Sequence, residues 1–147
     1  MSTTHIRKLA AGDTELAQLV FSVMASVFGE ASDSVSAEYV AALLNREDFW
    51  VIAALVDGEP IAGLTAFILP LTRSELAELF IYDIAVVPTH QRHGIGRRLV
   101  EKVRHLATER GIATIWVPAE NEDIHALEFY RSMDGAPSAV TIFTFSK

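Results

Sequence analysis

The sequence contains no cysteine among its 147 residues. This absence excludes disulfide frameworks, thiol nucleophiles, iron–sulfur clusters and cysteine-based zinc sites. Glycine and proline are also few, with 8 and 5 residues, and half of the residues are hydrophobic. Such a composition excludes disordered and low-complexity chains. We therefore expect a folded protein, and the length suits a single domain over residues 1–147.

Long apolar runs are missing as well. No stretch approaches the roughly 18 residues that span a bilayer, and residues 1–8 lack the apolar core of a secretory signal. We therefore expect a soluble, cytoplasmic protein. Positive charge is scarce, because 12 Lys and Arg stand against 19 Asp and Glu and give a net charge of −7. An acidic chain disfavours nucleic acid and anionic membranes as partners and favours a small cationic amine.

The few basic residues gather in one part of the chain. Between Pro88 and Arg110, six Lys and Arg outnumber two Glu, so this stretch carries a charge of +4 and the remainder carries −11. Two ligand regions of opposite charge would explain this contrast. A solvated basic helix face is the commoner explanation for such a stretch.

Hydropathy patterns predict a single-domain mixed α/β fold, in which a mostly antiparallel sheet is flanked by helices and contains a central βαβ crossover. The expected strands are 4–9, 49–56, 60–69, 76–87, 112–117 and 139–145, and the expected helices are 14–28, 36–44, 94–110 and 123–133. Asp13 or Thr14 is expected to cap the first helix, and Asp57-Gly58 predicts a hairpin turn. Residues 81–87 and 112–117 should be parallel neighbours, and a ligand site is expected at their carboxyl ends.

The stretch from Gln91 to Arg98 has the features of an anion site. It follows a strand that ends at Pro88, and Gly94 and Gly96 open an amphipathic helix. Unpaired N–H groups at a helix start, and glycines that permit close approach, suit a pyrophosphate. The stretch has neither the Gly-Lys-Ser/Thr of a P-loop nor the third glycine of the dinucleotide fingerprint, so it predicts a different phosphate-binding turn.

The motif Gln91-Arg92-His93-Gly94-Ile95-Gly96 resembles the signature with which Gcn5-related N-acetyltransferases bind the pyrophosphate of acetyl-coenzyme A. Residues 84–88 match a strand end in that family whose bulged backbone binds the pantetheine arm and polarises the thioester carbonyl. The family's Ala-x-x-Phe-Tyr helix signature is matched by residues 126–130. The resemblance covers essentially the whole chain and implies acetyl-coenzyme A as cosubstrate. It assigns to the coenzyme Ile84, Ala85, Val86, Gln91, Arg92, His93, Gly94, Ile95, Gly96, Arg97 and Arg98.

Residues 80–86 and 120–130 are similar to the type I aminoglycoside 3-N-acetyltransferases. This narrower resemblance implies acetylation of the 3-amino group of an aminoglycoside, and dimers common among such relatives leave a homodimer open. One departure is Met133-Asp134-Gly135, where the family usually has Leu-Gly-Phe. Another cationic amine, such as a polyamine or a peptide N-terminus, is an alternative substrate. A noncatalytic acyl-coenzyme A sensor is an alternative function.

Acetyl transfer to a protonated amine needs a base and an acid for the departing thiolate. Asp83 is the expected base, because a carboxylate in an otherwise apolar strand is costly unless it is paired or functional. A strand-end Asp bonded to nearby backbone is its structural alternative. Tyr82 has the opposite strand parity and is expected to be core or pocket wall. Tyr130 resembles the family tyrosine that protonates the thiolate, although an aromatic on this helix could also be core.

An acidic cluster follows the strand at 112–117. Glu120, Asn121, Glu122 and Asp123 are expected to bind ammonium groups of the substrate, with helix capping by Asp123 as the alternative explanation. The five histidines show no metal-binding spacing and no Gly-x-Ser-x-Gly elbow occurs, so we expect neither a metal site nor a serine hydrolase. Trp50 and Trp116 are both expected in the core.

Overall fold

The computed structural model describes residues 3–30 and 35–147. The strands are β1 (Thr4–Lys8), β2 (Phe49–Val56), β3 (Glu59–Pro70), β4 (Ala77–Val86) and β5 (Thr114–Trp116). The helices are α1 (Thr14–Val27), α2 (Ala37–Leu44), α3 (Ile95–Glu109) and α4 (Ile124–Ser132), with a short 3-10 helix η1 (Pro88–His90). In this part of the chain no helix combines the length and the hydropathy that crossing a membrane requires.

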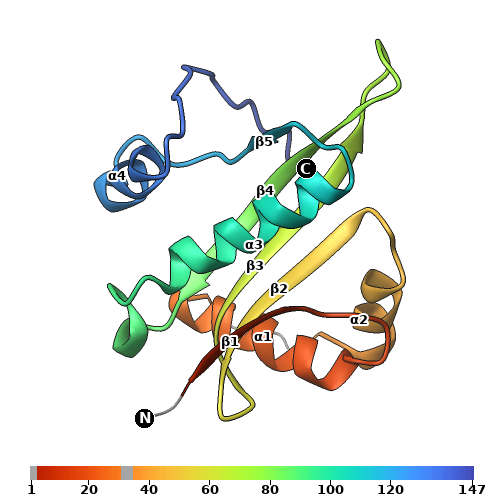
Figure 1. The fold of residues 1–147 in the computed structure, drawn as a ribbon, viewed down its shortest axis with the longest axis vertical. Coiled ribbons are helices and arrows are strands. Elements are labelled where there is room, and N and C mark those ends of the chain that lie inside the picture. Colours follow the sequence, from red (N-terminus) through yellow and green to blue (C-terminus); the bar gives the residue numbers. More distant parts are fainter. Residues whose placement is uncertain (1–2, 31–34) are drawn as a thin grey trace.

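The five strands form one sheet in the order β1-β2-β3-β4-β5 (Figure 1). Neighbours from β1 to β4 are antiparallel, and β5 runs parallel to β4. Asp57 and Gly58 take φ angles of 51° and 80°, as the tight turn between β2 and β3 requires. Since α3 crosses from β4 to β5, the predicted mixed sheet with a central βαβ unit is confirmed.

The sheet separates two cores. On one face, Leu64 packs in a cluster with Leu99 of α3. On the other face, Val51 of β2 packs in a cluster with Val20 of α1 and Val40 of α2. Figure 1 shows α3 lying across the front of the sheet, with α1 and α2 on the other side. Side chains that alternate along a strand are therefore delivered to two different helical layers.

Gly63 of β3 lets α1 approach the sheet closely. A Cβ atom at this position would lie 2.6 Å from Val20 Cγ1 and 2.7 Å from Met24 Sδ. We expect Gly63→Ala to lower the free energy of unfolding by about 1–3 kcal/mol, because extra volume in a packed interface forces neighbouring side chains or backbone to move. Urea denaturation measures the change, and an unaltered midpoint would show that α1 can move away without loss.

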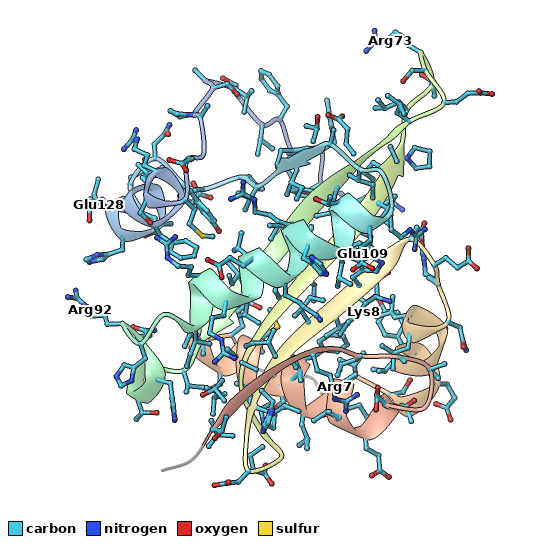
Figure 2. All side chains as sticks on the ribbon, in the orientation of Figure 1. Arg7, Lys8, Arg73, Arg92, Glu109 and Glu128 are labelled. Atoms are coloured by element: carbon cyan, nitrogen blue, oxygen red, sulfur yellow. The ribbon has the colours of Figure 1, made fainter. Side chains whose placement is uncertain are left out.

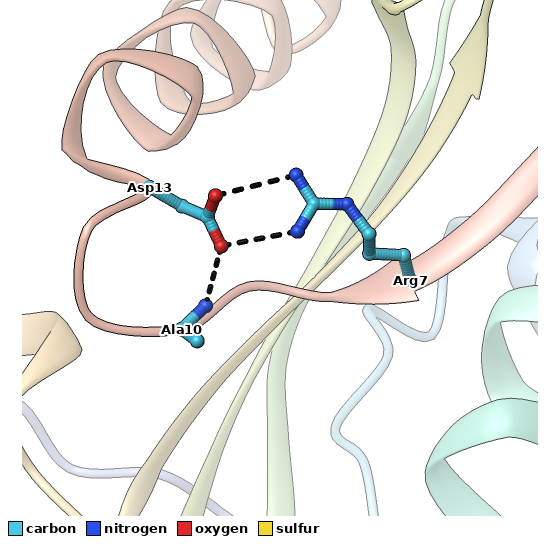
Figure 3. Close-up of polar contacts among 3 residues, drawn as sticks. All are labelled: Arg7, Ala10 and Asp13. Atoms are coloured by element: carbon cyan, nitrogen blue, oxygen red, sulfur yellow. Dashed lines mark hydrogen bonds and ion pairs between the residues drawn. The ribbon is translucent and has the colours of Figure 1, made fainter.

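The first helix begins differently from the prediction. The Asp13 side chain makes no capping bond to α1. Instead, its Oδ2 accepts a hydrogen bond of 2.8 Å from the Ala10 N–H, and its carboxylate pairs with the Arg7 guanidinium at 3.1 and 3.3 Å (Figure 3). The hydrogen bond from Arg7 lowers the pKa of Asp13 below its usual range. Asp13 therefore joins β1 to the turn before α1, whereas Ser36 caps α2 as expected by accepting from the Tyr39 N–H.

The expected strand at 139–145 is absent, so that prediction is wrong. Residues 136–147 form no helix or strand and are exposed. The composition favours a strand, but a strand also needs a neighbour to complete its backbone hydrogen bonds. Among residues 3–30 and 35–147, β5 pairs only with β4, over three residue pairs.

Candidate functional site

The strands β4 and β5 diverge at the end where α3 begins. In the described part of the chain, they pair only over Glu78–Phe80 and Thr114–Trp116, and from Ile81 to Val86 the strand β4 pairs with β3 alone. The other edge of β4 therefore offers backbone N–H and C=O groups to a ligand. Residues Ile84, Ala85 and Val86 lie on this open stretch, as the coenzyme assignment requires. Ala85 is buried, so it can serve a ligand only through its backbone.

A β-bulge at Tyr82 decides where the neighbouring carboxylate points. Thr65 of β3 pairs with Asp83, and Ala66 pairs with Ile81, which leaves Tyr82 as an extra residue in β4. The resemblance implied a bulge within residues 84–88, whereas the structure has it just ahead of them, at Tyr82. Asp83 lies opposite Thr65 and shares the α1 and α2 side of the sheet with Ala85, which packs in that core.

Asp83 is half-buried, and its surroundings disfavour the ionised carboxylate. Burial raises the pKa of Asp83 above its usual range, and the negative charge of Glu30 raises this pKa further. Glu30 lies three residues after the end of α1, and its N–H donates to the carbonyl of Ala25. A carboxyl with a raised pKa beside a second carboxylate is suited to attract a cation and to accept a proton.

Aromatic side chains of β3, β4 and β5 form a partly exposed surface, which we call the aromatic wall: Phe67, Phe80, Tyr82 and Trp116. Phe80 and Trp116 are stacked with ring centroids 4.3 Å apart. The Tyr82 ring meets Phe80 and Phe67 edge-on, at 5.7 and 6.0 Å. Tyr82 is 59% exposed and Trp116 is 44% exposed. Tyr82 therefore does not lie in the core, which was one of its two expected places, and the expectation of a core Trp116 is wrong.

Trp50 is the tryptophan that does lie in the core, with 2% exposure, as expected. The difference between the two tryptophans follows from their strands. Trp50 is in β2, inside the sheet, whereas Trp116 is in β5, whose described pairing is with β4 alone. A side chain on a short, terminal strand has fewer neighbours to cover it.

The loop from Val87 to Gly94 presents the start of α3 with free N–H groups. Gly94 has φ 77°, a left-handed conformation that glycine adopts without strain. The first hydrogen bond of α3 runs from the Arg98 N–H to the Gly94 carbonyl. Among the described residues, the N–H groups of Ile95, Gly96 and Arg97 have no intrahelical acceptor and form the positive end of the helix dipole. This geometry fits a pyrophosphate.

The side chains of the turn have different tasks. Gln91 Nε2 donates to the Val86 carbonyl at 2.9 Å and ties the loop to the end of β4. Ile95 is buried in the core against the sheet, so only its N–H can face a phosphate. Arg92 and His93 are exposed, and Figure 2 shows Arg92 projecting from the loop ahead of α3.

Arg97 and Arg98 are held by other elements. The Arg97 guanidinium donates to the carbonyl and Oγ of Ser132 in α4, at 3.3 and 3.2 Å. The Arg98 guanidinium donates to the Thr4 carbonyl in β1 at 3.0 Å. Both side chains thus connect α3 to neighbouring elements, while their positive charge still adds to the field at the turn.

Gly96 has a packing role that the sequence did not reveal. A Cβ atom at Gly96 would lie 3.3 Å from Cζ of Phe129, so α4 packs its aromatic side chain onto the first turn of α3. This contact places the Phe-Tyr pair of α4 beside the turn at the start of α3. The Phe129 and Tyr130 rings meet edge-on with centroids 5.2 Å apart.

Tyr130 is largely covered. Burial, and secondarily the negative charge of Asp123, raise the pKa of Tyr130 to about 12. The phenol is therefore fully protonated at neutral pH, which is the state a proton donor requires. Its partial exposure leaves its expected role and a packing role both compatible with the structure.

The acidic cluster after β5 is exposed, and one member has a structural task. Asp123 Oδ1 accepts from the Ala126 N–H at 3.1 Å and caps α4, which is the alternative that the sequence left open. Glu120, Asn121 and Glu122 lie on the exposed loop before this cap. The carboxylate that acts electrostatically on Asp83 is instead Glu30, which the sequence reading missed because nothing local marks a lone Glu after a helix.

The sequence profile of the Acetyltransferase (GNAT) family matches residues 15–134. Ribosomal protein bS18-alanine N-acetyltransferase of Escherichia coli strain K12 is 35% identical over 63 residues, which span 43% of this chain and 43% of that protein. An uncharacterized N-acetyltransferase of Archaeoglobus fulgidus is 33% identical over 101 residues, 65% of this chain and 66% of the relative. The chain thus matches less than half the length of the E. coli relative.

Solved structures extend the similarity to nearly the full chain. An aminoglycoside acetyltransferase, meta-AAC0020, from an uncultured soil metagenomic sample has a TM-score of 0.93 and 32% identity over 98% of this chain and 96% of its own; it was determined with sisomicin. The aminoglycoside acetyltransferase AAC(6')-Iy in complex with CoA, at 16% identity and a TM-score of 0.83, shows the same fold. With the profile covering most of its length, this chain belongs to the GNAT acetyltransferase family.

Proposed function

We propose that the protein transfers the acetyl group of acetyl-coenzyme A to an amine of a small polycationic substrate of the aminoglycoside class, at the 3-amino group. The observation that carries this proposal is the position of Asp83. Its half-buried carboxyl has a raised pKa, lies beside Glu30 and adjoins the opening between β4 and β5. Enzymes of the GNAT family use acetyl-coenzyme A, which supplies the donor.

The coenzyme binds, in this proposal, at the front of the sheet. The free N–H groups of Ile95, Gly96 and Arg97 receive the pyrophosphate, and the arginines of the turn add positive charge. The pantetheine arm extends along the open edge of β4 between Ile84 and Val86. A backbone N–H on that edge hydrogen-bonds the thioester carbonyl and stabilises the oxygen as negative charge develops on it.

The amine approaches from the side of the sheet that carries α1 and α2. Asp83 and Glu30 attract its ammonium form, and the aromatic wall supplies an apolar surface for the ring that bears it. Asp83 then accepts one proton, directly or through a water molecule. This leaves a neutral amine with a lone pair, which is the nucleophilic form.

The bond changes then balance without a covalent enzyme intermediate. The amine nitrogen attacks the carbonyl carbon and forms the new C–N bond. The C–S bond breaks and leaves the coenzyme as a thiolate, to which Tyr130 donates its phenolic proton. The amide nitrogen loses its second proton to solvent, and coenzyme A leaves as the free thiol. Asp83 then releases its proton to solvent, and Tyr130 regains one from solvent, which restores both groups for the next turnover.

Two observations favour different amines. The aminoglycoside class is supported by the similarity to meta-AAC0020, which reaches nearly the full length of both chains. A protein N-terminal alanine is the second candidate, since the E. coli relative is described as a ribosomal-protein alanine N-acetyltransferase. The number of positive charges distinguishes the two candidate substrates. The carboxylates of Asp83 and Glu30 suit a compact polycation, whereas a peptide N-terminus presents one ammonium group.

A thiol-release assay with acetyl-coenzyme A and a panel of amines tests the function. The panel contains aminoglycosides with and without a 3-amino group, a linear polyamine and a peptide with N-terminal alanine. We expect the highest kcat/KM with the 3-amino aminoglycosides, and mass spectrometry of the product should locate the acetyl group there. Preference for the peptide would transfer the assignment to the second candidate. Coenzyme binding without release on any amine would support a noncatalytic sensor.

Coenzyme binding at the turn is testable at Gly96. We expect Gly96→Val to weaken coenzyme A binding at least about tenfold, because a side chain at the helix start obstructs the phosphate. Calorimetry measures this affinity. Since a Cβ at Gly96 also meets Phe129, the double variant with Phe129→Leu is the control. Persistent loss in the double variant supports obstruction of the phosphate, and restored binding would attribute the effect to displacement of α4.

A further inference from the structure

The helix α4 has few apolar contacts with the rest of the protein. None of its residues, Ile124–Ser132, is buried. Its Phe129 packs against the core on the α3 side of the sheet and meets the first turn of α3 at Gly96. Met133, directly after the helix, is buried in the same core. A helix of nine residues with so little burial needs further contacts to keep one position on the protein.

The last carbonyls of α4 are bonded in two different ways. The Gly135 N–H donates to the Tyr130 carbonyl at 2.9 Å, and the Asp134 N–H donates to the Arg131 carbonyl at 3.0 Å. Asp134 takes the left-handed conformation, with φ 65°. These are the two bonds of a Schellman motif, which closes a helix with the residues that directly follow it. The next two carbonyls lie outside this motif and need other donors.

Two arginines of α3 supply those donors. The Arg97 guanidinium donates to the carbonyl and Oγ of Ser132, and Ser132 Oγ donates in turn to the Phe129 carbonyl at 2.6 Å. The Arg104 guanidinium donates to the Met133 carbonyl at 3.4 Å. Arg97 and Arg104 lie on one face of α3, because a spacing of i to i+7 brings two residues to the same side of a helix. Their positive charges also lie near the negative end of the α4 dipole, which is favourable.

We propose that Arg97 and Arg104 are positioning residues for Tyr130, because they bind the C-terminal end of α4 to α3. This inference rests on the proposed function, in which the Tyr130 hydroxyl protonates the departing thiolate. Such a donor must come within hydrogen-bond reach of the sulfur, and a misplacement of about 1 Å can slow a step of this kind about 100-fold. The two arginines act through the backbone of α4 and do not touch the reacting atoms.

Arg104→Met tests the proposal, because it removes the donors, keeps an unbranched side chain and lies outside the turn proposed for the coenzyme. We expect kcat to fall about tenfold while the Kd for coenzyme A changes less than about twofold. Lys102→Met is the matched control, since it removes the same charge from the same helix. Lys102 lies four residues after Arg98, on the side of α3 from which Arg98 reaches β1. The control should change neither constant.

The same substitution in a Tyr130→Phe background shows whether Arg104 acts through the phenol. Without the hydroxyl its position no longer affects the rate, so Arg104→Met should then lower kcat by less than about twofold. An equal loss of kcat in both backgrounds would mean that Arg104 acts by another route, and this result would overturn the proposal. Unchanged kcat in the presence of the hydroxyl would also overturn it.

Hydrogen exchange distinguishes a failure of this proposal from a failure of the proposed function. In Arg104→Met we expect the backbone amides of residues 127–135 to exchange at least about tenfold faster, with β4 unaffected. Unchanged exchange in α4, or equal acceleration in β4 through a general loss of stability, contradicts the positioning role whether or not any amine is acetylated. Faster exchange confined to α4, in a protein whose wild type acetylates no amine, supports the attachment of α4 by the arginines and refutes the proposed acetyl transfer instead.

Discussion

Asp83→Asn is expected to lower kcat about 100-fold or more while coenzyme A binding is retained. Asparagine keeps the shape and hydrogen-bonding capacity of the side chain but removes its charge and basicity, so the amine loses its proton acceptor. Steady-state kinetics with an amine from the panel measures the change. If Asp83 only anchors the cation, KM rises while kcat stays nearly constant.

The pH profile separates the role of Asp83 further. Wild-type activity should fall at acidic pH as Asp83 becomes protonated, with an apparent pKa above the usual carboxyl range because burial and Glu30 raise it. The variant should lack this acidic limb and recover partly at high pH, where the amine loses its proton unaided. A variant with full activity at every pH would move the base to another carboxylate, first among them Glu30.

Stability provides the control for Asp83→Asn. The raised pKa of Asp83 means that the folded protein holds this proton more tightly than the unfolded chain does. The contribution of Asp83 to the free energy of unfolding is therefore fully present at pH values below its pKa in the unfolded chain. It is lost as the pH rises through its higher pKa in the folded protein. At neutral pH the ionised carboxylate is a cost to folding. Asp83→Asn should melt at the same or a higher temperature, and a clearly lower Tm would indicate a structural role.

Tyr130→Phe is expected to lower kcat by about 100-fold with little change in stability. The variant keeps the ring that packs against Phe129 and removes the hydroxyl that protonates the thiolate. Because the pKa of Tyr130 is raised to about 12, the wild-type profile should show no loss of activity from tyrosine ionisation below about pH 10. A stopped assay for free coenzyme A measures the rate.

The chain offers matched controls, since it has three tyrosines. Tyr39→Phe removes the hydroxyl of a residue that is 58% exposed on α2, and we expect full activity. Tyr82→Phe keeps the aromatic wall and should alter KM more than kcat, if at all. Turnover near the wild-type value for Tyr130→Phe would show that water or another group protonates the thiolate.

The sequence predicted correctly those turns and helix ends that depend on residues close together in the chain. The turn at Asp57-Gly58, the Ser36 cap and the start of α3 after Gly94 depend on residues within a few positions of one another, and the structure has all three. The mixed sheet followed from the order of the elements. The strand expected at residues 139–145 was mispredicted because a strand-forming composition says nothing about a partner, and a strand is completed by non-local contacts.

The candidate site likewise has features that are local in the sequence and features that are not. The turn proposed to bind the coenzyme was visible because glycines and a helix start encode it over a few residues. On the acceptor side, Asp83 was expected from the sequence, but the bulge at Tyr82 was not, and it breaks the alternation on which strand parity arguments depend. Glu30 acts electrostatically on Asp83 although the two residues are far apart in the sequence. This pair could therefore not be identified without the fold.

The bulge at Tyr82 also has a consequence for how such a protein can change. A regular strand has a period of two, so removal of one regularly paired residue from β4 would reverse the side on which every following residue lies. Deletion of Tyr82 itself would not, because Ile81 and Asp83 already pair with the consecutive residues Ala66 and Thr65. An insertion or deletion at a regularly paired position of β4 therefore exchanges the side chains on the two faces of the strand, whereas a substitution alters one side chain on one face. Laboratory evolution of substrate range in this scaffold is expected to preserve the length of β4 and to vary its side chains.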